Sequence, residues 1–268
     1  MSLTLYHNDL STCAQKVRLV LAEKAIAWEG RELDLRAGDQ RDPSYKALNP
    51  RGVVPTLVHG DTVVTESTVI IEYLDDAFPD PALRPADAGK RAAMRWWMKR
   101  IDDDLHRMTG VLSYAIAFRQ DHLERPDGGK AMLEATKDPQ ERMIRAALLD
   151  QGLDFPGVGK AFAVVDGAIA EAEARLTEAS YLAGSYSLAD AAWTPYLNRF
   201  AHLGLDWLWA ERPHLADWWA SLQSRASYRT ALADVERSEK VAAMNEAGRA
   251  GTERIAAWRE TLGKEEAL

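Results

Sequence analysis

The sequence is poor in the features that mark disulfide-stabilised, metal-binding and membrane proteins. One cysteine in 268 residues excludes an internal disulfide, so nothing points to an oxidising compartment. Six histidines without paired helical spacing, beside that single cysteine, offer no metal framework. No apolar run is long enough to span a bilayer, and the first ten residues lack the basic and apolar regions of a signal peptide. We therefore expect a cytoplasmic protein without a metal.

Positive charge is also in short supply. The chain has 33 Lys and Arg against 41 Asp and Glu, which gives a formal net charge of −8. Nucleic acids and anionic membranes both need clustered cations on a partner, so neither is expected to bind here. A hydrophobic content of 47% is ordinary for a globular protein, and the length suits one large domain or two modest ones.

One stretch, residues 49–67 (NPRGVVPTLVHGDTVVTES), organises the chain. It predicts a loop, a strand starting at Pro55, a turn, a short second strand, and a helix that opens at Glu66 and Ser67. Proline has no N–H for a ladder, but the first position of a strand tolerates that loss. An X-Pro bond at a tight turn can be cis, and a cis Val54-Pro55 bond would leave nearby backbone free to pair with an extended peptide.

The predicted helix start at Glu66 and Ser67 adds a second binding feature. The first N–H groups of a helix lack intrahelical acceptors, and the helix dipole favours an anion at this end. The Ser67 hydroxyl supplies a further donor. A ligand with a peptide backbone and a free carboxylate fits both features.

The flanking sequence predicts two domains. Before and after this stretch, strand and helix patterns alternate in the order β-α-β-α-β-β-α, a thioredoxin-like arrangement. Three prolines within residues 79–85 mark a domain boundary. We expect an α/β domain at 1–79, a linker at 80–87 and an all-helical domain at 88–268.

The second domain has three further features. Residues 88–119 predict one long helix, and residues 120–159 form an insertion with Gly/Pro clusters at both ends, which we interpret as a lid. Ser187 and Asp190 form a capping box, so Asp190 is interpreted as structural. The charged tail, residues 239–268, predicts an outward-facing helix.

These motifs resemble those of the glutathione transferase superfamily. The resemblance rests on V-P-x-L followed by E-S at a helix start, and on LYHNDLSTCAQKVRLVLAEK before it. The run NPRGVVPTLVHGDTVVTESTVIIEYLDDAFPDPALRPADAGKRAAMRWWMK is most similar to the bacterial branch that contains glutathione-dependent β-aryl etherases of lignin catabolism. The resemblance implies a thioredoxin-like domain that binds glutathione, an all-helical domain that shapes an apolar acceptor site, and a homodimer.

Such chemistry depends on glutathione's thiol becoming a thiolate, because only the thiolate attacks. A hydroxyl that donates to sulfur at a helix start would stabilise it by ~1.5–3 kcal/mol, or about one to two pKa units. Three candidates follow the first strand: Ser11, Thr12 and Cys13. The family pattern favours Ser11; Cys13 could instead be a reactive thiol that forms a mixed disulfide, or all three could only cap the helix.

The resemblance also assigns the glutathione contacts. Val54 would pair its backbone with the cysteinyl unit, and Pro55 would hold the cis turn. Glu66 would bind the γ-glutamyl ammonium and Ser67 the γ-glutamyl carboxylate. Gln40 falls where a polar side chain reaches the glycyl carboxylate, although a surface role in its loop is an equal alternative.

Two further contacts are expected from the family pattern. A cation usually helps near the position of Val53; this chain has no cation there, and Arg51 is the candidate to compensate. Asp103 or Asp104 could reach the partner subunit's γ-glutamyl amine, although a solvated acidic helix face is the simpler interpretation.

The sequence therefore predicts a glutathione transferase acting on a small apolar or aromatic electrophile. In the etherase version, the attacked carbon bears an aryl ether next to a carbonyl. A general detoxifying transferase, isomerase or peroxidase fits the same residues. A non-catalytic binding module is the alternative from another class, and the intact glutathione signature weighs against it.

Overall fold

The computed structural model describes residues 2–265 and divides into two compact units. Unit 1 comprises residues 1–99, 175–197 and 214–237, and unit 2 comprises residues 100–174, 198–213 and 238–268. All of the predicted N-terminal domain therefore lies in unit 1. No helix of the described residues is long and apolar enough to cross a membrane.

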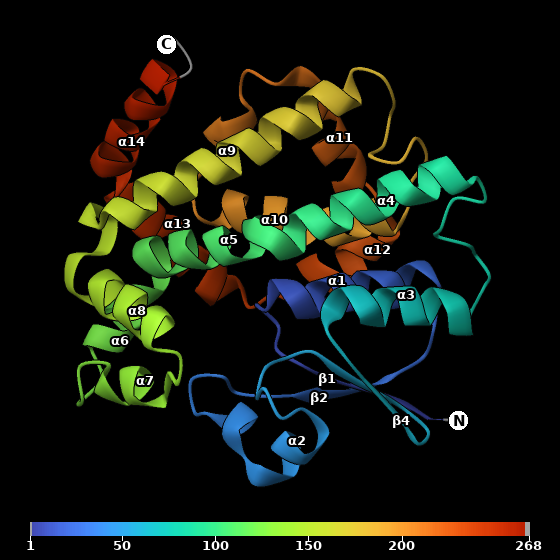
Figure 1. Ribbon diagram of the computed structural model, residues 1–268, viewed down its shortest axis with the longest axis horizontal. Helices are drawn as coiled ribbons and strands as arrows, with labels where there is room; N and C mark the ends of the chain where they lie inside the picture. The colour runs from blue at the N-terminus through green and yellow to red at the C-terminus, as the bar shows by residue number, and fades with distance from the viewer. Residues whose placement is uncertain (1, 266–268) are drawn as a thin grey trace. The chain divides into compact units, whose positions relative to one another are not determined.

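The N-terminal part of unit 1 has the predicted thioredoxin-like order. Its elements are β1 (Leu3–His7), α1 (Thr12–Glu23), β2 (Glu29–Glu32), α2 (Pro43–Leu48), β3 (Thr56–His59), β4 (Thr62–Thr65) and α3 (Ser67–Ala77). The sheet order is β2-β1-β3-β4, with β1 parallel to β2 and β3 antiparallel to both of its neighbours. Helices α1 and α3 lie on one face of the sheet and α2 lies on the other (Figure 1).

Apolar side chains of the sheet and of the two helices on one face form the core of this domain. Leu5 and Leu57 from the sheet, Val17 from α1, and Ile70 and Leu74 from α3 are each 0% exposed. Burying an aliphatic side chain of this size contributes about 1.5–3 kcal/mol, so these contacts fix how α1 and α3 lie on the sheet. The N-termini of both helices are thereby held in place.

The predicted long helix at 88–119 is helical but not uniform. It comprises α4 (Ala88–Arg100), π-helical residues Ile101–Leu105, α5 (His106–Ser113), π-helical residues Tyr114–Phe118 and α6 (Arg119–Leu123). Short π-helical turns inside α-helices are rare and are often found at functional sites. The periodicity of apolar residues does not distinguish them from an α-helix.

The remaining elements are helical, as predicted. They are α7 (Lys130–Ala135), α8 (Pro139–Gln151), α9 (Pro156–Leu176), α10 (Leu188–His202), α11 (Pro213–Gln223), α12 (Ala226–Tyr228), a π-helical turn Arg229–Ala233, α13 (Ser238–Ala250) and α14 (Thr252–Glu265). Just before the insertion, the Arg119 side chain donates to the carbonyl oxygens of Leu149 and Asp150 inside it, both at 2.9 Å. These bonds tie the last turn of α8 to α6.

The charged tail is helical but only partly outward-facing. Met244 on α13 and Ile255 on α14 are 3% and 5% exposed. Gly248 packs closely, because a Cβ added there would lie 2.2 Å from the Leu203 carbonyl oxygen. The prediction of an outward-facing tail was therefore wrong for these faces, and residues 266–268 lie outside the described part.

The capping box at the start of α10 is confirmed. Asp190 is 0% exposed, and its Oδ2 accepts from the Ser187 N–H at 2.9 Å and from the Ser187 hydroxyl at 3.0 Å. Its Oδ1 accepts from the Leu182 N–H and from Trp218 Nε1, both at 3.1 Å. All of the carboxylate's bonds therefore serve the local fold.

Candidate functional site

The sequence-predicted residues of unit 1 gather at one end of the sheet. In the register, Tyr6 of β1 is opposite Thr56 of β3, and Thr56 is opposite Thr65 of β4. His7, the last residue of β1, is opposite Glu32, the last residue of β2. The segments that follow β1, β2 and β4, and the one that precedes β3, therefore leave the sheet at the same end.

Ser11 caps the first of the two helices that start there. Its Oγ accepts a hydrogen bond from the Ala14 N–H at 3.3 Å, as expected of an N-cap. Because the oxygen acts as acceptor in this bond, the hydroxyl proton remains available to a ligand. Thr12 is 7% exposed, whereas Cys13 is half-buried on the first turn. All three predicted candidates therefore lie at the positive end of the α1 dipole.

Val54 is joined to Pro55 by a cis peptide bond, as predicted. Strand β3 begins one residue later than predicted, after Pro55, so Val54 lies outside the ladder. Within residues 2–265, neither the N–H nor the C=O of Val54 takes part in a hydrogen bond. The preceding carbonyl is fixed, since Val53 O accepts from Tyr45 Oη at 2.6 Å and from Asn49 Nδ2 at 2.9 Å.

Tyr45 and Asn49, which the sequence interpretation missed, fix the backbone beside Val54. Both are buried, at 3% and 2% exposure, and both also contact the Thr56 hydroxyl, at 2.9 and 3.1 Å. Burial raises the pKa of Tyr45, against the lowering effect of its bonds to Thr56 and Asn49. Their spacing of four residues, which places both on one side of α2, was the only available signal.

Glu66 precedes α3 with φ 67° and ψ 113°, a backbone conformation that non-glycine residues rarely adopt. Its side chain does not cap the helix but forms an ion pair with Arg51. Both members of this pair are largely exposed, at 52% and 68% of the side chain. Ser67, the first residue of α3, is 7% exposed. The start of α3 thus combines a carboxylate, a guanidinium and N–H groups that the Glu66 side chain does not cap.

Gln40 lies in a short 3-10 helix, Asp39–Arg41, in the connection between β2 and α2. Its Nε2 donates to Leu35 O at 3.3 Å, and its Oε1 is buried without a partner among the described residues. In this orientation Gln40 offers an acceptor; turning the amide over would offer the donor that a carboxylate needs. Gly52, with φ 62°, packs against this connection, because a Cβ there would lie 2.9 Å from Gln40 O.

Asp103 and Asp104 lie in the π-helical turn Ile101–Leu105 of unit 2. Asp104 has ion contacts with Arg100 at 3.7 Å and with Arg107 at 3.9 Å. Trp97 and Trp193 belong to the core of unit 1. Trp193 is 0% exposed, and its Nε1 donates to Trp97 O at 3.0 Å.

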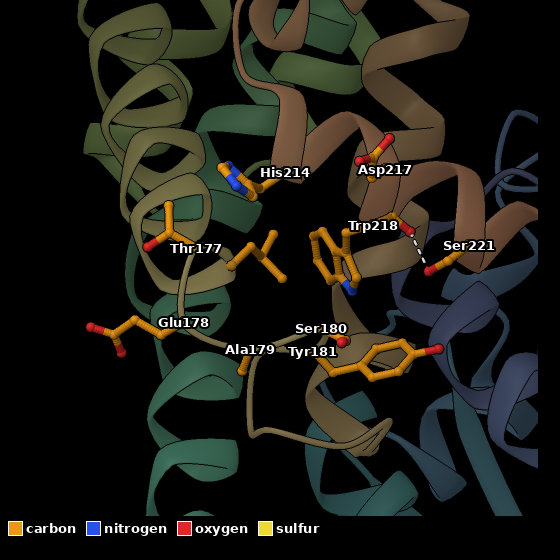
Figure 2. Close-up of a pocket in the computed structure, with 10 residues that line it drawn as sticks. Thr177, Glu178, Ala179, Ser180, Tyr181, His214, Asp217, Trp218 and Ser221 are labelled. Carbon is orange, nitrogen blue, oxygen red and sulfur yellow. Dashed lines mark hydrogen bonds between the residues drawn. The ribbon is translucent and has the colours of Figure 1, made fainter.

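Unit 1 also has an open groove of about 460 Å³ that contains none of the predicted site residues. It lies between residues 176–181 and α11, with the Trp218 ring at its centre and His214 and Asp217 at one end (Figure 2). Trp218 is 3% exposed and bonded to Asp190, so its ring serves the core. We do not include the groove in the candidate site.

Comparison with known proteins identifies the family. Residues 10–77 match the family described as "Glutathione S-transferase, N-terminal domain". The tetrachloro-p-hydroquinone reductive dehalogenase of Sphingobium chlorophenolicum is 31% identical over 85% of this chain and 94% of that protein. Protein LigF of Sphingobium sp. strain SYK-6 is 29% identical over 92% of this chain and 99% of its own length. The crystal structure of β-etherase LigF superposes with a TM-score of 0.77, covering 86% of this chain and 98% of that one. The chain therefore belongs to the glutathione S-transferase family.

Proposed function

We propose that this protein is a glutathione transferase in which the glutathione thiolate attacks an electrophilic carbon and a leaving group departs. The proposal rests on the groups that lie together at the end of the sheet where α1 and α3 both begin. This end combines an uncommitted Ser11 hydroxyl proton, unpaired backbone at Val54 and a start of α3 that Glu66 does not cap. Family membership supports the same conclusion.

Glutathione is bound through its peptide backbone and its charged ends. The N–H and C=O of Val54, after which the chain turns at Pro55, pair with the cysteinyl unit as a strand would. Glu66 takes the γ-glutamyl ammonium, while Ser67 and the first N–H groups of α3 take the carboxylate. Gln40 contacts the glycyl carboxylate after its amide turns over.

Ser11 donates its hydroxyl proton to the thiolate and keeps it, so Ser11 is a stabiliser and not a base. Burial, followed by Arg18, lowers the pKa of His7 to about 4, with Asp9 acting in the opposite direction. His7 is therefore neutral near neutral pH and adds no cation to the site. Thr12 and Cys13 remain alternatives for the contact with sulfur.

The proposed substrate is a β-aryl ether next to a ketone, in lignin-derived aromatic catabolism. A C–S bond forms at the β-carbon, the C–O bond breaks, and the phenolate leaves with the bonding pair. Similarity to LigF over nearly the whole chain supports this choice. A chloro-aromatic acceptor is the second candidate, supported by the reductive dehalogenase relative and by Cys13 on the first turn of α1.

We also propose a cytoplasmic homodimer, with residues 1–79 binding glutathione and residues 88–268 shaping the acceptor site. Exposed apolar side chains in unit 1 support a subunit interface, since Val69 on α3 and Trp96 on α4 are 55% and 52% exposed. In such a dimer, Asp104 reaches the partner's γ-glutamyl amine. Sedimentation analysis of the wild type should give twice the chain mass, and a monomer would refute the dimer.

The test of function is release of a fluorescent phenol from a β-aryl ether with an adjacent ketone. Each enantiomer is assayed separately, with and without glutathione. We expect release that depends on glutathione and favours one enantiomer. Turnover of an activated aryl chloride without ether cleavage would support the transferase assignment but refute the ether substrate, so the natural acceptor would be another electrophile. No turnover of either compound would favour a non-catalytic binding module.

A further inference from the structure

A buried arginine supports the loop that leads to Ser11. Arg18 lies on α1 and is 2% exposed. Its Nη1 donates to Asn8 O at 3.2 Å, its Nη2 to Asp9 O at 3.0 Å and its Nε to Ala231 O at 2.9 Å. One planar guanidinium thus joins the loop after β1 to a segment 213 residues away in the chain.

A direct bond links this loop to Ser11. The Ser11 N–H donates to Asn8 O at 3.3 Å, the same carbonyl oxygen that accepts from Arg18. The Asn8 side chain stiffens the turn further, because its Oδ1 accepts from the Leu10 N–H at 3.1 Å. The position of the Asn8 carbonyl therefore sets the backbone of Ser11 and, through it, the direction of the hydroxyl.

Three more side chains support the same loop, Gln15 and Arg237 directly and Glu236 through Gln15. Gln15 Nε2 donates to Asp9 O at 3.0 Å and to Glu236 Oε1 at 2.9 Å. Arg237 contacts the buried Asp9 carboxylate at 3.1 Å and the Glu32 carboxylate at 2.7 Å. We call Gln15, Arg18, Glu236 and Arg237 the loop clasp.

Nearby carboxylates offset the effect of burial on the guanidinium of Arg18. Burial lowers the pKa of Arg18 to about 10, and the carboxylates of Glu236, Asp9 and Glu32 act against this. Arg18 thus stays charged near neutral pH. Lysine would keep the charge but lacks the rigid fork that reaches three carbonyl oxygens at once.

We propose that Arg18 is a positioning residue for thiol activation. It acts through loop 8–10 to aim the Ser11 hydroxyl, and residues 231–237, far from the N-terminal domain in sequence, form part of the activating machinery. The inference rests on the proposed role of Ser11. Displacing a reacting group by about 1 Å can cost ~100-fold in rate, so a loosened loop should lower activity without removing any ligand contact.

The test compares Arg18→Lys with Arg225→Lys in the full-length protein. Arg225 also joins α1 to a distant segment, through its 2.7 Å ion pair with Glu23, but it does not contact loop 8–10. For each variant, the pKa of bound glutathione is followed by thiolate absorbance, and kcat and the KM for glutathione are measured with an activated aryl chloride.

We expect Arg18→Lys to raise the pKa of the bound thiol and to lower kcat by ~10- to 100-fold near neutral pH. The KM for glutathione should change less than about threefold, because the contacts at Val54, Glu66 and Ser67 are intact. Arg225→Lys should lower the melting temperature and leave the thiol pKa in place. Equal pKa shifts in both variants, or none in Arg18→Lys, would overturn the proposal.

Two further variants make the outcome decisive. If Arg18→Lys does not fold, Arg237→Ala, which removes the 47%-exposed arm of the clasp, should shift the thiol pKa in the same direction by a smaller amount. An unchanged profile would then count against the clasp. Ser11→Ala separates the two levels of the argument. If Ser11→Ala and the clasp variants all leave the thiol pKa unchanged, the proposed role of Ser11 is wrong. If Ser11→Ala raises the thiol pKa and the clasp variants do not, only the proposed role of the clasp is wrong.

Discussion

Replacing Ser11 with alanine removes the observed helix cap and the proposed bond to the thiolate, and the two losses can be measured separately. The bond from the Ala14 N–H to Ser11 Oγ caps α1, and losing such a cap costs about 0.5–2 kcal/mol of stability. The donated bond to a thiolate is worth about 1.5–3 kcal/mol, because one partner is charged. That second loss raises the thiol pKa by about one to two units.

The kinetic consequence follows from the thiolate fraction. A thiol with pKa near 7 is about half ionised at neutral pH, whereas one at ~8.5 is only a few per cent ionised. Ser11→Ala should therefore lower kcat/KM at neutral pH by ~10- to 20-fold and recover much of the loss at alkaline pH. The assay is the pH profile of kcat/KM for the acceptor at saturating glutathione, beside thiolate absorbance of the bound glutathione.

A matched control isolates the loss of the cap. Asp138 caps α8 by accepting from the Gln140 N–H at 3.0 Å, and α8 lies in unit 2. Asp138→Ala should therefore lower stability by a similar amount and leave the pH profile unchanged. Ser11→Thr keeps both the cap and the hydroxyl, so it should retain the profile. An unaltered pH profile in Ser11→Ala would refute Ser11 as the residue that stabilises the thiolate, and Thr12→Val and Cys13→Ala would then test the two alternatives.

Three other perturbations have defined outcomes. Glu66→Gln removes the partner of the γ-glutamyl ammonium, so the KM for glutathione should rise by ~10- to 100-fold while kcat changes little; a kcat loss with unchanged KM would contradict this role. His7 has a folded-state pKa of about 4 against 6.5 for the ordinary group, so its neutral form contributes stability that is complete above pH 6.5 and lost as pH falls towards 4. The free energy of unfolding should therefore fall less between neutral pH and pH 4 in His7→Gln than in the wild type, by about 3 kcal/mol. Denaturant titrations of both proteins at the two pH values measure this difference. Asp190→Ala leaves buried N–H donors of Ser187, Leu182 and Trp218 without their acceptor, and should cost about 3–5 kcal/mol in denaturant unfolding with an unchanged KM for glutathione in the folded fraction.

The order of elements was predictable because it depends on local patterns. Turn residues, proline positions and the Ser187–Asp190 box each act within a few residues, and the structure has the predicted helices and strands close to the expected bounds. The π-helical turns were not predictable, since they keep the apolar periodicity of an α-helix. Lys24 also escaped prediction: its side chain is 0% exposed and binds Asp75, Phe78 O and Pro81 O, partners supplied by the linker and the end of α3.

The site divides in the same way between local and distant determinants. The Ser11 cap, the cis Val54-Pro55 bond and the helix start at Ser67 follow from sequence motifs. The loop clasp does not, because Arg18 in a helical pattern gives no sign that its partner is Ala231. Contacts across such separations depend on which segments the fold brings together, and a single sequence does not record this.

The distribution of side-chain and backbone contacts explains why the reaction class is easier to assign than the substrate. Glutathione's cysteinyl unit is expected to pair with main-chain groups of Val54, and its carboxylate with main-chain N–H groups of α3, so few side chains are needed to hold it. These few, Ser11, Glu66 and Ser67, form a recognisable motif. The acceptor, by contrast, is expected to be held by apolar side chains, for which many residue combinations give similar shapes and energies. Substitutions at the end of the sheet should therefore affect all acceptors alike, whereas substitutions within residues 88–268 should change which acceptor is used. In Glu66→Gln, kcat/KM for glutathione should fall by the same factor with every aryl ether and aryl chloride of a panel. A factor that differs strongly between acceptors would show that glutathione binding and acceptor selection are not separated in this way.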